Sequence, residues 1–235
     1  MAVTPRGGAS ANQQHKSLTG QAAQARATRQ AGGKVVRGQS ETALKKQARA
    51  WEAGSVGEQR AQRKLDLLRR YGFSIAHDVL LEPGKRWNLD HLVIGPPGVF
   101  FVDAKNWRGK VYLGRDGVLM RRWFAGRTQG SKTASMADEV MKVRAMAGHA
   151  SGRLGHPVAP VICLAGAQSR HFEGVAKSQG VYVVGVETVM PWLRDSAPTL
   201  SKEQVGMLSE ISERLFRPAT PPKPVEPWGQ QMRER

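Results

Sequence analysis

Two short, strongly apolar runs, Trp87–Gly95 and Val99–Lys105, flank the turn Gly95-Pro96-Pro97-Gly98. Each run has apolar residues on both of its faces, which is typical of central strands that other elements cover on both sides. Glycine and proline at the junction are residues that tight turns favour. The pattern therefore predicts a hairpin of two buried antiparallel strands.

The same patterns predict further elements on either side of this hairpin. Ser55 and Glu58 have the spacing of a capping box, and apolar residues follow at helical intervals. Ser201 and Gln204 have the same spacing near the C-terminus. The predicted helices cover residues 55–71, 134–154 and a segment that opens at 201, and the further predicted strands cover residues 74–81, 110–113, 118–123, 158–165 and 181–184. This order predicts an α/β or α+β fold in which helices flank a central sheet.

Both ends of the chain differ in composition from the middle. Residues 1–54 are rich in Gln, Ala, Gly, Ser, Lys and Arg, so we expect a disordered basic tail with partial helix over residues 42–53. Residues 218–235 contain too many prolines for a helix or a sheet, and we expect a second tail there. The predicted folded domain is therefore residues 55–217.

The chain is strongly basic, with 36 Lys and Arg residues against 19 Asp and Glu residues and a net charge of +17. Nine basic and two acidic residues give the N-terminal tail a charge of +7, which leaves +10 for the rest. Such an excess predicts a polyanionic partner, with nucleic acid favoured over an anionic membrane surface. For the tail itself, an electrostatic arm and a merely solvated extension both remain open.

Cysteine usage and the apolar segments favour a cytoplasmic location. The single cysteine, Cys163, lies in an apolar run and is expected to be a buried small hydrophobe, so there is no disulfide framework and no cysteine zinc site. The six histidines are scattered and do not form a metal-binding set. No run approaches the roughly 18 apolar residues of a membrane span, and no signal peptide is recognisable. The oligomeric state stays open.

The predicted hairpin brings two carboxylates together. In a symmetric hairpin Ile94 pairs with Val99, and Asp90 then lies opposite Asp103 at a Cβ separation of roughly 4.5 to 5.5 Å. Lys105 lies two residues beyond Asp103 and projects from the same face. Opposed like charges are destabilising unless a positive charge lies between them. These three residues therefore predict a site for a divalent cation.

Glu58 is the fourth candidate, because it lies on the same helical stripe as Ala61 and Leu65 and points toward the sheet. Taken alone, it is explained as well by helix capping. The combination is more specific, and its motifs are Gly57-Glu58, Asn88–Gly95, Gly98–Val102, Asp103-Ala104-Lys105-Asn106 and Gly109. Over residues 55–165 the chain resembles the nuclease-related domain (NERD) family of the PD-(D/E)xK nuclease superfamily.

This resemblance implies a restriction-endonuclease-like core and metal-dependent hydrolysis of DNA phosphodiester bonds, in DNA processing, repair or defence. Asp90 and Asp103 would hold Mg²⁺ or Mn²⁺ together with the backbone carbonyl of Ala104, since such ions prefer hard oxygen ligands. Glu58 would bind the ion directly or through water. Lys105 would orient the attacking water and stabilise its hydroxide form.

The chain departs from the family pattern in two places. Asp103 stands where many relatives have glutamate, and the asparagine-proline pair of relatives is absent. Gln129 is then the tentative counterpart of the glutamine that opens the next helix in relatives. Basic and aromatic residues near the site are candidates for holding phosphates and stacking bases. With Gln129, the predicted nucleic-acid-binding residues are Arg86, Arg108, Arg121, Arg122, Trp107 and Lys132.

Two other functions remain open. One is a nucleic-acid-binding module whose nuclease fold is inactive, although such a module has no need for opposed buried carboxylates. The other is a resolvase-like protein that binds branched DNA. The sequence does not discriminate DNA from RNA or endonuclease from exonuclease.

Overall fold

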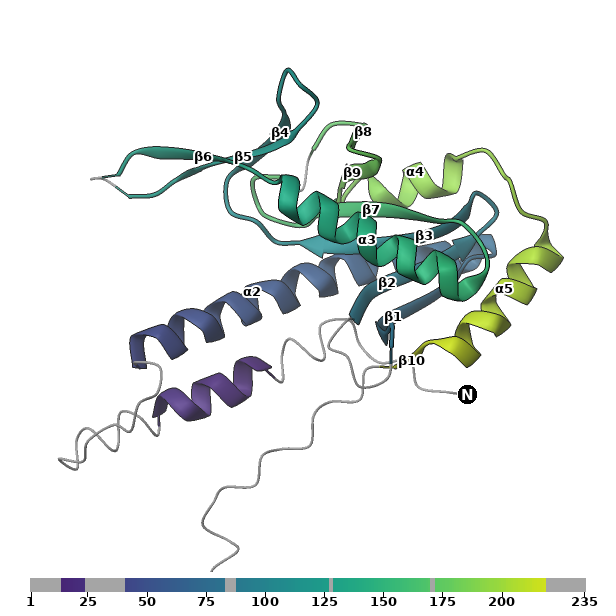
Figure 1. The fold of residues 1–235 in the computed structure, drawn as a ribbon, viewed down its shortest axis with the longest axis horizontal. Coiled ribbons are helices and arrows are strands. Elements are labelled where there is room, and N and C mark those ends of the chain that lie inside the picture. Colours follow the sequence, from purple (N-terminus) through teal and green to yellow (C-terminus); the bar gives the residue numbers. More distant parts are fainter. Residues whose placement is uncertain (1–13, 24–40, 83–87, 127–128, 170–171, 219–235) are drawn as a thin grey trace, which may run out of the picture. The chain divides into compact units, whose positions relative to one another are not determined.

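The computed structural model describes residues 14–23, 41–82, 88–126, 129–169 and 172–218. These residues belong to two units, one of residues 53–218 and the other of residues 14–23 with 41–52. The larger unit contains two sheets, and helices cover both faces of the larger one (Figure 1). The predicted α/β class is confirmed.

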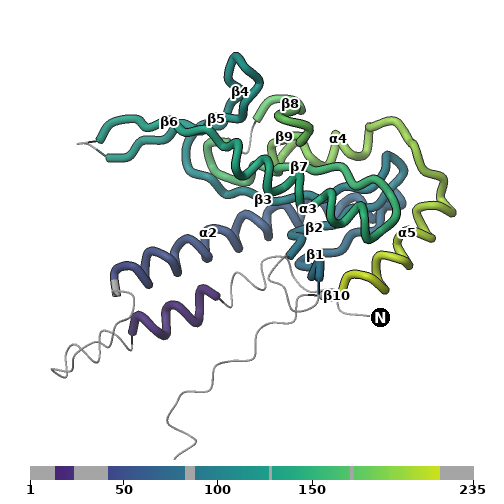
Figure 2. Tube along the Cα trace, viewed as in Figure 1, coloured from purple at the N-terminus to yellow at the C-terminus, as the bar shows by residue number. Residues whose placement is uncertain are grey.

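The larger sheet has seven strands in the order β10-β1-β2-β3-β7-β9-β8, and Figure 2 follows the chain through them. The strands are β1 (Ser74–Leu80), β2 (Asn88–Gly95), β3 (Gly98–Lys105), β7 (Val158–Leu164), β8 (Val175–Ser178), β9 (Val181–Gly185) and the two-residue β10 (Arg217–Pro218). Strand β7 is parallel to β3 and β9, and the other pairings are antiparallel. The sheet is therefore mixed, and β2 and β3 lie inside it as predicted.

Four α-helices and one 3-10 helix have defined bounds: α2 (Glu41–Leu65), η1 (Asp66–Tyr71), α3 (Ala137–Leu154), α4 (Val189–Asp195) and α5 (Lys202–Leu215). Helices α3 and α5 pack on one face of the sheet, where Phe101 and Ile162 are fully buried. The C-terminal part of α2 and α4 pack on the other face, where Cys163 is a buried hydrophobe as predicted. None of the helices in these described segments has the length and apolar character needed to cross a bilayer.

The hairpin of β2 and β3 has the predicted register. Ile94 pairs with Val99, and Gly95 pairs with Gly98 across the two prolines. Gly98 has φ of 133°, a backbone conformation that residues with a side chain rarely adopt. The amides of Thr199 and Leu200 donate to the Pro96 carbonyl at 2.7 and 2.9 Å. Hydrogen bonds from a distant loop thus hold the turn in place. The turn in turn fixes the register of the two strands that it joins.

The prediction that a helix begins at Ser55 is wrong, because α2 begins at Glu41 and runs through this position. Ser55 is buried within the helix and accepts a hydrogen bond from the Gln59 side chain at 3.2 Å. The residues before it are mainly Ala, Lys, Gln, Arg and Glu, which favour helix enough to continue through Gly54. The second capping box is confirmed, since Ser201 caps α5.

Part of the N-terminal region that we expected to be disordered is helical. Residues 14–23 form a helix, and Leu18 and Ala22 cluster with Leu44 and Ala48 in the smaller unit. Two pairs of apolar residues, each pair four positions apart, are a weak signal, which explains the difference. The remaining tail residues, 1–13, 24–40 and 219–235, lie outside the described residues, so the expected disorder is untested there.

The expected helix over residues 134–154 begins later, at Ala137, because residues Ser131–Ser135 form strand β6. This strand completes a small antiparallel sheet with β4 (Lys110–Leu113) and β5 (Leu119–Phe124), in the order β4-β5-β6. Strand β6 reads SKTAS and has no apolar alternation that could predict it. We call the β4–β5–β6 sheet the arm.

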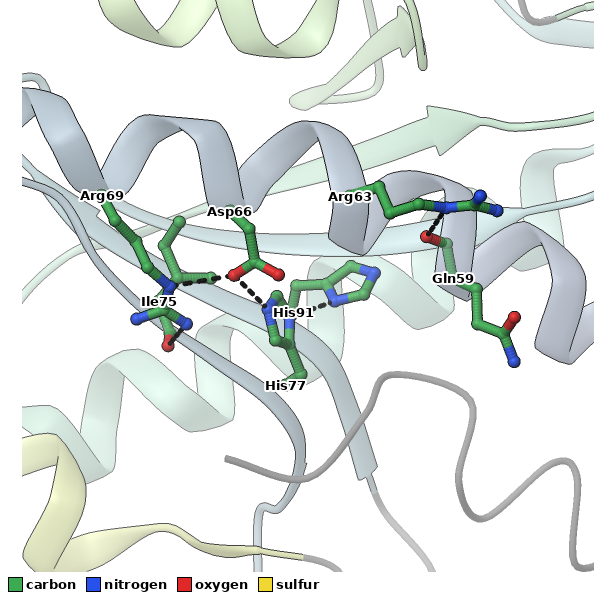
Figure 3. Close-up of polar contacts among 7 residues, drawn as sticks. All are labelled: Gln59, Arg63, Asp66, Arg69, Ile75, His77 and His91. Carbon is green, nitrogen blue, oxygen red and sulfur yellow. Dashed lines mark hydrogen bonds and ion pairs between the residues drawn. The ribbon is translucent and has the colours of Figure 1, made fainter. Parts of the chain in front are cut away.

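A buried histidine pair lies between β1 and β2 (Figure 3). The Nδ1 atoms of His77 and His91 are 2.8 Å apart, and His77 Nε2 lies 3.1 Å from the carboxylate of Asp66. Burial lowers the pKa of His77, although the Asp66 carboxylate opposes this effect. Burial and the nearby His77 lower the pKa of His91 well below its ordinary value. Both rings are therefore neutral in the folded protein at neutral pH.

We expect the free energy of unfolding to decrease as the pH falls below about 6.5, the ordinary histidine value. Because the pKa values of His77 and His91 are lowered in the folded protein, the unfolded chain binds more protons there than the folded chain, and each histidine contributes a slope of at most about 1.4 kcal/mol per pH unit. Urea unfolding at pH 7.5, 6.5 and 5.5 measures this slope. His91→Gln should flatten it and His156→Gln, a control outside the pair, should not. Equal stability of the parent at all three values would contradict the assignment.

Candidate functional site

The candidate site lies where β2 begins and β3 ends. Paired residues run from Gly95 opposite Gly98 to His91 opposite Val102, and one further step in this register places Asp90 opposite Asp103. At this step the Ala104 amide donates to Asp90 Oδ2 at 2.9 Å. The N–H and C=O of a strand residue point to the same side of the strand, so the Ala104 carbonyl also faces the Asp90 side. The hairpin thus presents two carboxylates and a backbone carbonyl together.

Lys105 neutralises part of this negative charge. Its Nζ lies 2.9 Å from Asp103 Oδ2, although the contact is an ion pair without hydrogen-bond geometry. Burial alone would lower the pKa of Lys105, but the carboxylates of Asp103 and Asp90 more than offset this and raise it. Lys105 is therefore a permanent cation at the edge of the site. Asp103 Oδ2 is left buried with no hydrogen-bond donor.

Glu58 reaches the site from α2 through close packing at Gly57. A Cβ on Gly57 would lie 2.7 Å from the Cβ of Asn106, the residue that follows β3. The Asn106 side chain also donates to the Ala53 carbonyl at 2.6 Å, so α2 is held against the end of β3. Glu58 is one residue further along α2, and its charge acts on Asp90. Glu58 thus lies near Asp90, on a helix that begins earlier than predicted.

Glu139 is a site residue that the sequence analysis missed. It lies in the first turn of α3, and its Oε2 atom is 3.1 Å from Lys105 Nζ. Lys105 therefore bridges Asp103 on the sheet and Glu139 on a helix. Helices α2 and α3 cover opposite faces of the sheet, so the site receives an acidic residue from each side (Figure 1). The acidic pair Asp138-Glu139 within the predicted helix over residues 134–154 was the available signal, but acidic residues near the N-terminus of a helix are equally well explained by the helix dipole.

Asp90 is a strongly perturbed acid. It keeps some accessible surface, yet protein atoms surround it, and this burial is the largest cause that raises its pKa well above the ordinary value. The charges of Asp103 and Glu58 raise the pKa further, while Lys105 and the Ala104 amide lower it. One lysine does not compensate three carboxylates. A cation at this position would relieve the remaining repulsion.

These residues suit a divalent ion by their chemistry, since Asp90, Asp103 and the Ala104 carbonyl supply only hard oxygen donors. The buried Asp103 Oδ2, in an ion pair with Lys105, is a candidate ligand atom. In the described part of the chain, however, no three His, Cys, Asp or Glu side chains are grouped so that they could hold a metal ion. The donor set that fits is therefore two carboxylates with the backbone carbonyl, and Glu58 is not grouped with them as a third ligand.

Several predicted nucleic-acid-binding residues lie in or beside the arm. Arg121 and Arg122 are in β5, and Lys132 is in β6 opposite Trp123. Arg121 packs over the Trp123 ring at 4.7 Å and donates to the Arg108 carbonyl at 2.8 Å. Burial and the nearby Arg108 charge lower the pKa of Arg121. The arm is thus a concentration of positive charge that begins immediately after the candidate site.

The other predicted contact residues have different positions. Trp107 is partly buried and packs against the core beside α3, which leaves less of its ring for stacking. Gln129 lies in the turn between β5 and β6, and α3 begins only at Ala137, so Gln129 does not open this helix. Arg86 lies outside the described residues.

A comparison with family models matches residues 53–165 to the nuclease-related domain. Residues 53–165 are a nuclease-related domain. The match covers α2 from Ala53, the hairpin, the arm, α3 and β7, and it includes all four acidic residues and Lys105. The family predicted from the motifs is confirmed.

Among curated proteins, an uncharacterized protein of Bacillus anthracis is 35% identical to the chain over 71 residues, which are 29% of this chain and 33% of that protein. The chain thus covers about a third of the length of this relative. No solved structure matches the chain. The similarity therefore identifies the nuclease-related domain, while the activity has to be argued from the site.

Gly57→Ala should destabilise the nuclease-related domain, because the new methyl group would collide with Asn106 and force α2 away from β3. Overpacking of this kind costs roughly 1–3 kcal/mol. Gly54→Ala is the matched control, since its nearest atom is Glu58 Oε1 at 4.0 Å. In the same helix this control should be neutral or stabilising by about 1 kcal/mol. Thermal unfolding of both variants measures the difference, and equal stabilities would contradict the close packing that positions Glu58.

Proposed function

We propose that the domain is a metal-dependent nuclease that hydrolyses phosphodiester bonds of DNA, with Mg²⁺ or Mn²⁺ as its cofactor. The feature that carries the proposal is the β2–β3 register, whose next step beyond His91 and Val102 brings Asp90 opposite Asp103, beside Lys105, in a domain of the nuclease-related family. A protein that only binds nucleic acid gains nothing from two buried acids that repel each other. DNA processing, repair and defence are the roles that such chemistry would serve.

In this proposal Asp90, Asp103 and the Ala104 carbonyl hold the ion. The Ala104 amide orients Asp90 by its hydrogen bond, so the second oxygen of this carboxylate stays available. The chemistry that a bound divalent ion supplies is neutralisation of charge on the scissile phosphate and easier deprotonation of water. Glu58 lies close enough to act electrostatically on Asp90 and would orient a water molecule beside it.

Lys105 orients the attacking water and stabilises the hydroxide that forms from it. The bridge from Asp103 to Glu139 holds its ammonium group in place, at 2.9 and 3.1 Å. Because both carboxylates keep Lys105 protonated, it serves as a fixed cation and a hydrogen-bond donor rather than as a general base. Glu139 is then a positioning residue, since it acts through Lys105.

A second function, a binding module without cleavage, is favoured by one observation. Asp103 Oδ2 is in an ion pair with Lys105, and the side chains of the described residues form no three-membered metal group. If this arrangement persists in solution, the lysine takes the place of the metal ion. Cleavage assays distinguish the two functions directly.

Asp103→Ala and Lys105→Ala should reduce metal-dependent cleavage by at least about 100-fold, a typical contribution of a catalytic group. DNA binding in EDTA should remain. The assay compares supercoiled plasmid, linear duplex, single strand and branched junction with Mg²⁺, with Mn²⁺ and with EDTA. Asp138→Ala is the matched control, because Asp138 precedes Glu139 in α3 and forms no ion pair with a described residue.

Two results would overturn the proposal. Variants that cut like the parent would show that the cleavage does not come from this site. Tight, salt-sensitive binding of DNA by the parent without cleavage under any metal would establish the binding module instead. A strong preference for the junction over linear duplex would identify a resolvase-like substrate.

A further inference from the structure

The arm has one face that packs on the domain and one that does not. Strand partners share a face of a sheet, and neighbours along a strand alternate between faces. The inner face carries Val111 and Leu119, which are buried in the core. The outer face carries every other residue of the same strands. We define the outer face by Lys110, Tyr112, Met120, Arg122, Phe124, Ser131 and Thr133.

Two cations on the outer face are directly opposed. Lys110 of β4 is the strand partner of Arg122 of β5. Opposed like charges destabilise a sheet, and no carboxylate of a described residue forms an ion pair with either of them. Residues 106–135 contain seven Lys and Arg residues and a single acid, Asp116. The outer face therefore has unbalanced charge that an anion would compensate.

An exposed aromatic ring lies beside these cations. Phe124 is 67% exposed, the largest exposure of any large apolar side chain among the described residues. Its strand partner is Ser131, whose side chain is too small to cover the ring. Leaving such a ring in water forgoes favourable burial. Phe124 is two residues from Arg122 on the same face, so a flat apolar surface and a phosphate-binding group are neighbours.

This combination fits an unpaired nucleic-acid strand better than a duplex. Bases in a duplex stack on one another and offer only their edges in the grooves, whereas an unpaired base exposes its π-face to an aromatic side chain. Cations that follow the backbone and aromatic rings that stack bases are the two elements of single-strand binding. Both are present on one flat sheet face.

The arm is attached to the rest of the domain at two places. A Cβ on Gly109 would collide with the Arg122 carbonyl, so β4 and β5 approach closely there. The Leu119 amide donates to Ser178 Oγ at 3.1 Å, and the Leu119 carbonyl accepts from Met136 at 2.8 Å. Lys110 follows Lys105 by five residues, a span of at most about 17 Å. Lys110 at the start of the arm therefore lies within reach of the chain segment that ends the candidate site.

We propose that the outer face of the arm binds single-stranded nucleic acid, with Phe124 stacked on an unpaired base and Lys110 and Arg122 bound to phosphates. The binding itself stands on the arm alone. Its role in delivering a strand for cleavage rests on the proposed function.

The test uses the full chain in EDTA, so that binding is measured without cleavage. Fluorescence anisotropy compares a labelled single strand of about 15 nucleotides, near the upper limit of common site sizes, with the duplex of the same sequence. Phe124→Ala should weaken single-strand binding about 10-fold, and Phe124→Trp should restore it. Duplex binding should change less than about 2-fold. Met207→Ala, an exposed apolar residue of α5, is the control and should change neither.

A second pair of variants tests the phosphate contacts. Lys110→Ala with Arg122→Ala should reduce the slope of log Kd against log salt by about 1.4, since each phosphate contact on a single strand contributes about 0.7. The residues substituted in these variants are on the surface, so we expect the variants to fold. Circular dichroism spectra measure this.

Three outcomes would overturn the proposal. They are unchanged single-strand affinity of Phe124→Ala, an equal loss on duplex and single strand, and equally Phe124-dependent binding of anionic lipid vesicles. The failure of the proposed function remains distinguishable. Phe124-dependent single-strand binding without cleavage under any metal would refute the nuclease and support the arm, whereas metal-dependent cleavage with unchanged binding by Phe124→Ala would do the reverse.

Discussion

The repulsion between Asp90 and Asp103 is the constraint around which the rest of the domain is arranged. The hairpin turn fixes the register, and the register opposes the two acids. Burial raises the pKa of Asp90, and the neighbouring carboxylates raise it further. Lys105 compensates part of this charge from the same strand, at 2.9 Å from Asp103. A domain selected for stability alone would replace these groups, since apolar side chains of similar size are usually at least as stable as buried charges.

Helices on both faces of the sheet support this arrangement. Gly57 lets α2 approach Asn106 closely enough for Glu58 to act on Asp90. Glu139 on α3 holds the other side of Lys105 at 3.1 Å. The arm follows β3 in the chain and carries a concentration of positive charge. Strand β3 thus connects the groups suited to the chemistry with the groups suited to the substrate.

The part of the site that could be predicted is the part that local rules determine. Strand alternation and the turn between Gly95 and Gly98 were enough to oppose Asp90 and Asp103, because both depend on neighbouring residues only. Helical periodicity predicted that Glu58 faces the sheet, and its charge acts on Asp90, although the helix begins at Glu41 and not at Ser55. The face on which a helical residue lies depends on its spacing from the other residues of the helix. A wrong prediction of where the helix begins therefore does not change it.

The other features of the structure depend on tertiary contacts, which local sequence patterns do not predict. Glu139 meets Lys105 through the packing of α3 on the sheet, and the polar sequence of β6 gave no sign of a strand. The N-terminal helix at residues 14–23 rests on Leu18 and Ala22, too little apolar surface to predict order. The outer face of the arm is defined by the pairing of β5 with β4 and with β6, which the sequence did not predict. Phe124 could therefore not be recognised as exposed before the fold was known.

Anomalous diffraction from crystals grown with Mn²⁺ tests directly whether the hairpin is a metal site. We expect an anomalous peak bounded by the carboxylates of Asp90 and Asp103 and by the Ala104 carbonyl, with Lys105 turned from Asp103 toward Glu139. A peak elsewhere, or no peak while the Lys105–Asp103 ion pair persists, would contradict the claim that this hairpin is a metal site.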